Sequence, residues 1–147
     1  MLPYTLDDLA ARFTACTLPK EHWTHLAHLS VGAWHVDRYG AEAALVTLRA
    51  GIQRLNDSHG VANSPTSGYH ETITVAYVRL IDAFLASFPD RTPLETRVAL
   101  LVGGPLADKA LLLRFWSKDL LMSAAARREW VAPDLAPLSL PASGLSA

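Results

Sequence analysis

The chain has 147 residues, of which 50% are hydrophobic, so it can bury the core of one ordinary domain and leaves little room for two. Its 13 Lys and Arg residues balance 14 Asp and Glu residues, giving a formal net charge of -1. General nucleic-acid binders carry a basic excess or a basic stripe, so this balance argues against nucleic acid as a partner.

The cysteine content and the apolar runs bear on the compartment. Cys16 is the single cysteine, which rules out an intramolecular disulfide and fits a reducing compartment. The N-terminal residues lack the basic start and apolar run of a signal peptide. The longest apolar runs, at 98–102 and 111–113, are too short to span a bilayer. We therefore expect a cytoplasmic protein without a membrane partner.

The first half of the chain predicts three helices, because apolar residues recur there at spacings of three and four. The first is expected over residues 6–16, with Thr5 as its N-cap. A long helix is expected over 21–39 and ends at Gly40, a residue typical of the position after a helix. The third covers 41–56, and its leucine and isoleucine stripe indicates core packing.

The second half begins with a polar segment at 57–68, followed by further helical patterns. Loops of this length are uncommon inside compact domains and often cover functional sites. A fourth helix is expected over 69–88, and a shorter one from Pro93 to Val102. Short helical pieces are expected over 106–115 and 123–130.

These elements predict an all-α, single-domain helical bundle of about five to seven helices, without a significant sheet. The helical domain is expected over residues 1–132. Residues 133–147 are rich in Pro, Ala, Ser and Leu, a composition that predicts an extended or disordered tail.

The informative stretch for function is a histidine stripe on the second expected helix. At about 100° per residue, Glu21, His25, His28, Gly32 and His35 fall on one narrow face. Histidines three residues apart are neighbours on a helix and can aim two ring nitrogens at one point. The glycine removes bulk at the centre of the stripe, so that a ligand or another helix can approach. His35, further along, is better explained as a buried or boundary residue.

A third imidazole is expected from the start of the fourth helix. His70, Thr74 and Tyr77 share one face of that helix, and Glu71 sits about 100° away. If this face meets the histidine pair of the second helix, His70 completes a cluster of three histidines. Glu71 would then be a ligand, a hydrogen-bond partner of a ligand or a general base.

We therefore name three sets of candidate site residues. The catalytic candidates are His25, His28, His70 and Glu71. The candidate metal ligands are His25, His28 and His70, and a divalent Zn, Fe or Mn ion would suit them. The candidate ligand-binding residues are Asn63, Ser67, Tyr69, Thr74 and Tyr77. If Thr24 is the N-cap, His25 lies in the first turn, where a helix favours neutral imidazole, the form that binds metal or accepts a proton.

Structural and functional alternatives stay open at this point. The histidines can simply form structural hydrogen bonds at the boundary between core and surface. Glu71 can belong to a helix cap, and the polar loop residues can stabilise turns. Lys109, Arg114 and Lys118 can bind an anionic ligand. The leading hypothesis is a small-molecule enzyme of hydrolytic or oxidative chemistry, with or without a metal. A non-catalytic ligand-binding or sensing module and a helical interaction or dimerisation domain are the alternatives, and a homo-oligomer is compatible with each.

An ordered set of short motifs also resembles a known family. The motifs are WTHxxHL at 23–29, NDxHG at 56–60, SGYHETIT at 67–74, LADK at 106–109 and FWS at 115–117. Together they look like a family of small bacterial helical proteins, over about residues 13–135 of this chain. The resemblance implies one compact helical domain and directs attention to His25, His28, His70 and Glu71. It implies no particular reaction or cofactor.

Overall fold

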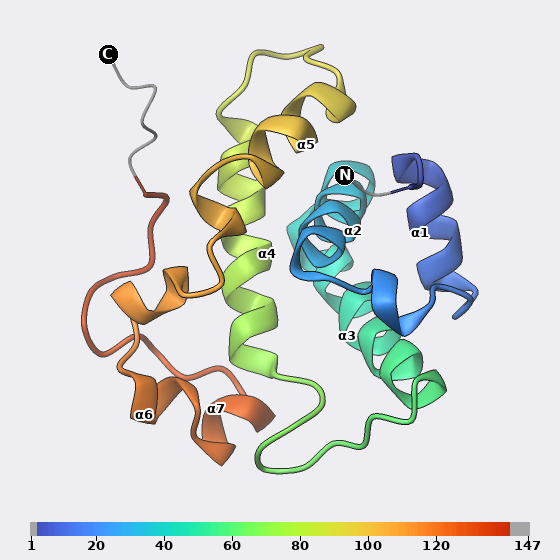
Figure 1. Cartoon of the computed structure of the whole chain (residues 1–147). Coiled ribbons are helices and arrows are strands. Elements are labelled where there is room, and N and C mark those ends of the chain that lie inside the picture. The colour runs from blue at the N-terminus through green and yellow to red at the C-terminus, as the bar shows by residue number, and fades with distance from the viewer. Residues whose placement is uncertain (1–2, 142–147) are drawn as a thin grey trace.

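The computed structural model describes residues 3–141, which form an assembly of helices (Figure 1). Within that range there is no strand, only a single antiparallel bridge between Ser64 and Ser67. The predicted all-α class is therefore confirmed. None of the helices in this range has both the length and the apolar character needed to cross a membrane.

The described part of the chain contains seven α-helices and three short 3-10 helices, among which η1 and α6 were not expected from the sequence. The α-helices are α1 (Leu6–Thr14), α2 (His25–Tyr39), α3 (Ala41–Ser58), α4 (Glu71–Ala86), α5 (Leu94–Val102), α6 (Lys118–Leu121) and α7 (Ala124–Arg128). The 3-10 helices are η1 (Lys20–His22), η2 (Pro105–Ala107) and η3 (Leu111–Arg114).

Local sequence explains where several helices begin and end. The side chains of Thr5, Thr24 and Ser123 each accept a backbone N–H in the first turn of the helix that follows. Gly40 separates α2 from α3 with φ +82°, a conformation that glycine adopts without steric cost. The expected N-cap at Thr5, the conditional one at Thr24 and the helix stop at Gly40 are confirmed.

The second helix is shorter than expected at its N-terminus. Residues 20–22 form a separate 3-10 turn, and α2 begins at His25. Thr24 has an extended backbone, with ψ 172°, and its hydroxyl caps the N–H of Ala27. Glu21 is therefore exposed on the 3-10 turn and is not part of the histidine stripe of α2.

Helix α2 is the organising element of the fold, because it contacts α1, α3, α4 and α5. It is almost surrounded, and its Leu29, Val31 and Ala33 are buried in the core. The long helix α4 runs beside α2 and α3 (Figure 1), and α7 packs against α4. Trp116 fills the core after η3 and is completely buried. The groove between α2, α3 and α4 is where the candidate site lies.

Residues 133–141 follow the bundle as an extended segment that packs against it. The N–H of Leu135 donates to the carbonyl of Phe115, at 2.9 Å. The carboxylate of Asp134 accepts the N–H of Ser117, at 2.7 Å. The expected tail therefore lies against the helical domain over this stretch, and the part of it from residue 142 onward lies outside the described residues.

Candidate functional site

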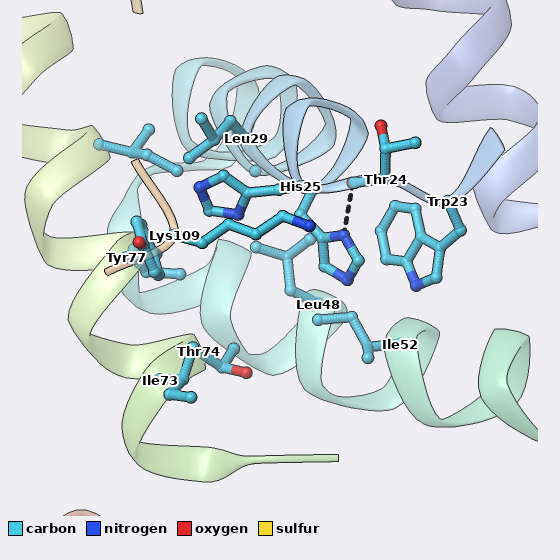
Figure 2. A pocket seen from close by; sticks show the side chains of 14 residues that line it. Trp23, Thr24, His25, Leu29, Leu48, Ile52, Ile73, Thr74, Tyr77 and Lys109 are labelled. Carbon is cyan, nitrogen blue, oxygen red and sulfur yellow. Dashed lines mark hydrogen bonds between the residues drawn. The ribbon is translucent and has the colours of Figure 1, made fainter. Parts of the chain in front are cut away.

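A pocket of about 410 Å³ lies between α2, α3 and α4, beside the turn that follows η2 (Figure 2). Small-molecule sites are typically concave, mostly apolar and about 300–1,000 Å³ in volume. The apolar walls come from Leu29 on α2, Leu48 and Ile52 on α3, and Ile73 and Ile81 on α4. The pocket therefore has the size and character of a small-molecule site.

Two histidines from the first turn of α2 line this pocket. The ring of His25 uses Nε2 to donate to the carbonyl of Leu106, at 2.8 Å. Because a carbonyl only accepts, the proton of neutral His25 is on Nε2, and Nδ1 carries a lone pair. The ring also meets Tyr77 edge to face, with centroids 5.3 Å apart. Packing and the carbonyl thus fix both the orientation and the tautomer of His25.

A backbone carbonyl also fixes His28, but as the other tautomer, with its proton on Nδ1. Its Nδ1 donates to the carbonyl of Thr24, at 2.7 Å, so Nε2 carries the lone pair. The ring stacks on Trp23 with centroids 3.7 Å apart. Although part of the ring is accessible, it lines a pocket walled by protein, where a charged imidazole loses much of its hydration.

The electrostatics of the pocket keep His28 neutral. Burial lowers the pKa of His28 from 6.5 to about 4, against the opposing effect of the bond to Thr24. Positive charge on His25 and Lys109 lowers this pKa further. His28 is therefore unprotonated at neutral pH and presents a hydrogen-bond acceptor to the pocket.

Three further polar groups belong to the same pocket. The hydroxyl of Tyr77 and the indole N–H of Trp23 are buried and have no hydrogen-bond partner among residues 3–141. Burial and the charge of Asp108 raise the pKa of Tyr77 to about 12, so the phenol keeps its proton. Lys109 is exposed on the pocket wall and forms no ion pair with any described residue. The pocket thus combines two imidazole acceptors, two donors unpartnered within the described residues, one cation and an apolar interior.

His70, the expected third imidazole, lies elsewhere. It is the N-cap of α4, with Nδ1 accepting the N–H of Ile73 at 3.2 Å and Nε2 donating to the carbonyl of Leu121 at 2.7 Å. Its backbone is extended, with φ -131° and ψ 107°, so its side chain does not follow the face of α4 that carries Thr74 and Tyr77. The prediction that His70, Thr74 and Tyr77 share one face of α4 was wrong, because His70 precedes the helix.

The predicted three-histidine metal site is accordingly not formed. Both ring nitrogens of His70 already bond to the protein, so neither can coordinate an ion as well. Across residues 3–141, no three His, Cys, Asp or Glu side chains come together in an arrangement suited to a metal ion. His25 and His28 remain as a pair without a third protein ligand.

Glu71 also belongs to a different site. Its two carboxylate oxygens accept from Arg49 at 2.9 and 2.6 Å, and Oε1 accepts from the hydroxyl of Tyr69 at 2.6 Å. The guanidinium of Arg49 holds the pKa of Glu71 below its ordinary value. Glu71 lines a second, more polar cavity of about 680 Å³, together with Asn63, Tyr69 and Arg127. The expected single site is therefore divided between two cavities.

The remaining candidates from the loop and from α4 separate in the same way. Thr74 and Tyr77 line the histidine pocket, as expected for ligand-binding residues. Asn63 accepts the N–H of Tyr69 at 3.0 Å, and Ser67 donates to the carbonyl of Ala62 at 3.2 Å, so both hold the loop in shape. Ser67 lines neither cavity, and its turn role explains it fully.

Sequence reasoning missed the contribution of α3 to the pocket. Leu48 and Ile52 belong to a stripe typical of core packing, and nothing in their spacing separates a pocket wall from a core. Trp23 stacks on His28 at the pocket, a contact that no spacing in the sequence indicates. Lys109 was one of three candidates for anion binding, and only the fold places it on the wall.

We expect the ion pair of Arg49 and Glu71 to matter for stability. Arg49→Met would leave a mostly buried carboxylate with Tyr69 as its remaining partner. The free energy of unfolding should fall by about 1–3 kcal/mol, between the effects of exposed and buried pairs. The pKa of Glu71 should rise at the same time. Urea unfolding at pH 7 and carboxyl ¹³C NMR would measure the two effects.

A matched control is the exposed pair of Arg12 and Asp8 on α1, whose side chains are 43% and 46% accessible. Arg12→Met should change the free energy of unfolding by less than about 0.5 kcal/mol. Equal effects of the two substitutions would contradict a special role for the Arg49–Glu71 pair.

Comparison of the chain with protein-family models, with curated proteins and with solved structures finds no match. The resemblance noted from the sequence motifs therefore remains a prediction, and the pocket itself is the basis for any functional assignment.

Proposed function

We propose that this chain is a small-molecule enzyme that carries out acid–base chemistry in the histidine pocket between α2, α3 and α4. One observation carries the proposal. His25 and His28 each donate one ring N–H to a main-chain carbonyl, so each presents an unprotonated nitrogen within one largely apolar pocket. Fixed neutral imidazoles beside a substrate cavity are the usual means of proton transfer in enzymes.

The two histidines would have different roles. A base works best when its pKa is near the ambient pH, and a pKa of about 4 makes His28 a weak base. His28 is therefore suited to accept a hydrogen bond and orient the substrate, with Trp23 holding its ring in place. His25 is then the proton acceptor, and the carbonyl of Leu106 stabilises the imidazolium formed on it.

A second candidate is a binding or sensing module without catalysis. The low pKa of His28 and the apolar walls favour it, because both suit a pocket that holds a ligand by hydrogen bonds and burial alone. The two candidates predict the same ligand contacts and differ only in whether the ligand is converted.

The test is an NMR screen of small organic acids, alcohols and amines in D₂O, where line broadening reports binding and signal loss reports conversion. The wild type should bind a subset of these compounds and convert at least one. Ile52→Trp fills the pocket from α3 and should abolish both effects. Val46→Trp, which changes a residue 64% exposed on the same helix, should abolish neither.

His25→Gln separates the two candidates. It should retain binding and lose conversion if the chain is an enzyme. Binding without conversion in wild type and variants alike would assign the chain to the binding class. If Ile52→Trp binds the same compounds as the wild type, the pocket is not the site and the proposal fails.

A further inference from the structure

The histidine pocket continues into a neighbouring cavity. This neighbouring cavity, about 270 Å³ in volume, shares four wall residues with the histidine pocket: His25, Ile73, Tyr77 and Lys109. Its other walls are mainly apolar and come from η3, α6 and their flanks. The two cavities therefore adjoin, and Lys109 stands at their common boundary.

The ionised side chains that line these two cavities are all of one sign. Lys109 and Lys118 are the ionised side chains that line them, and no Asp or Glu does so. Neither lysine forms an ion pair within residues 3–141. The neighbouring acid, Asp108, accepts the N–H of Ala110 at 2.9 Å and so turns toward its own backbone. The charge of Asp108 acts on Tyr77, but no carboxylate lines either cavity, so an anion entering here meets two ammonium groups that form no ion pair within residues 3–141.

Exposed apolar surface lies at the outer end of the neighbouring 270 Å³ cavity. Leu113 and Met122 both line it and are 40% and 45% accessible, respectively. A ligand with an extended apolar body would cover this surface and remove it from water. The two cavities thus offer apolar walls on both sides of the positive charge of Lys109, which stands at their common boundary.

Building on the proposed function, we infer that the ligand is an organic anion with an apolar body, whose carboxylate pairs with the ammonium of Lys109. The lysine can reach the ligand because it is exposed on the shared wall, and Figure 2 shows its side chain extending across the pocket beside His25. The apolar part would lie along Leu48 and Ile52 or extend toward Leu113. A charge-assisted bond in a partly apolar site selects a carboxylate over a neutral group of the same size.

Titration calorimetry with octanoate, octanol and octylamine at pH 7.5 and low salt tests this inference, because the three probes share one chain and differ in charge. Octanoate should bind the wild type about tenfold more tightly than octanol, and octylamine should bind most weakly. In Lys109→Gln the affinities for octanoate and octanol should come within about threefold of each other. Lys109→Arg should keep most of the preference, since it keeps the charge.

Lys20→Gln is the matched control, because it removes the same charge from η1, away from both cavities. It should leave the preference for octanoate unchanged. Raising the salt concentration should weaken octanoate binding and leave octanol binding nearly constant, which tests the ion pair without any substitution.

Failure of the inference is distinguishable from failure of the proposed function. If octanol binds the wild type as tightly as octanoate, and Ile52→Trp abolishes both, the pocket stands and its preference for anions is overturned. The same conclusion follows if Lys20→Gln and Lys109→Gln have equal effects. If none of the three probes binds the wild type, both the ligand class and the pocket as a site for such compounds are overturned.

Discussion

Replacing His70 with leucine should lower the free energy of unfolding by about 2–4 kcal/mol without abolishing ligand binding in the histidine pocket. The substitution removes the N-cap of α4, a contact worth about 0.5–2 kcal/mol. It also leaves the carbonyl of Leu121 without its imidazole partner, at a cost of about 1–3 kcal/mol. Urea unfolding followed by circular dichroism would measure the loss.

His70→Asn provides the matched comparison. Asparagine is a good N-cap and can accept the N–H of Ile73, but it is too short to replace the bond that Nε2 makes to Leu121. We expect roughly half the loss seen for His70→Leu. If His70→Leu instead left stability unchanged and abolished ligand binding, His70 would be a site residue and the structural role assigned to it would be wrong.

Acidification should destabilise the fold between about pH 6.5 and pH 4, a window that begins above the range in which carboxylates titrate. Burial lowers the pKa of His28 to about 4 and also lowers the pKa of His35 and His70. Nearby cations act in the same direction: Lys109 and His25 on His28, Arg38 on His35, and Arg127 on His70.

The direction of this change in stability follows from how many protons the folded and the unfolded states bind. In the unfolded chain each histidine takes up a proton near its ordinary pKa of about 6.5, whereas the folded protein resists protonation until lower pH. The unfolded state therefore binds more protons in this window, and stability present above pH 6.5 is lost as the pH falls toward 4. Glu71, whose pKa is lowered by Arg49, adds a further loss below its ordinary 4.5.

Urea midpoints measured at half-unit intervals from pH 8 to pH 3.5 would test this expectation. His28→Gln should flatten the decline in part, because it removes one imidazole that must stay neutral in the folded state. His59→Gln is the control, since His59 caps the end of α3 and bonds to the carbonyl of Leu18 outside the pocket. If the free energy of unfolding did not change from pH 8 to pH 4.5, the folded protein could not be holding these histidines neutral.

Local sequence determined the helical class, the order of the elements and most of their ends. Helix α1 begins after the predicted N-cap Thr5, because a capping side chain bonds to a backbone N–H within the first turn of its own helix. Helix α2 ends at the predicted Gly40. Local sequence determined only part of the candidate site. The i, i+3 spacing of His25 and His28 places both on the pocket, because both lie in the first turn of α2, which begins at His25.

The tertiary structure decided the rest of the site. Whether His70 meets the pair on α2 depends on a backbone conformation at the N-cap and on the position of Leu121, 51 residues away. The partners of Glu71 likewise include Arg49 from another helix. No periodicity encodes such contacts, because the side-chain pattern of a helix fixes which face a residue occupies and leaves open which segment that face meets. Long-range packing therefore brought Lys109 to the pocket of His25 and His28 and placed His70 and Glu71 in contacts outside it.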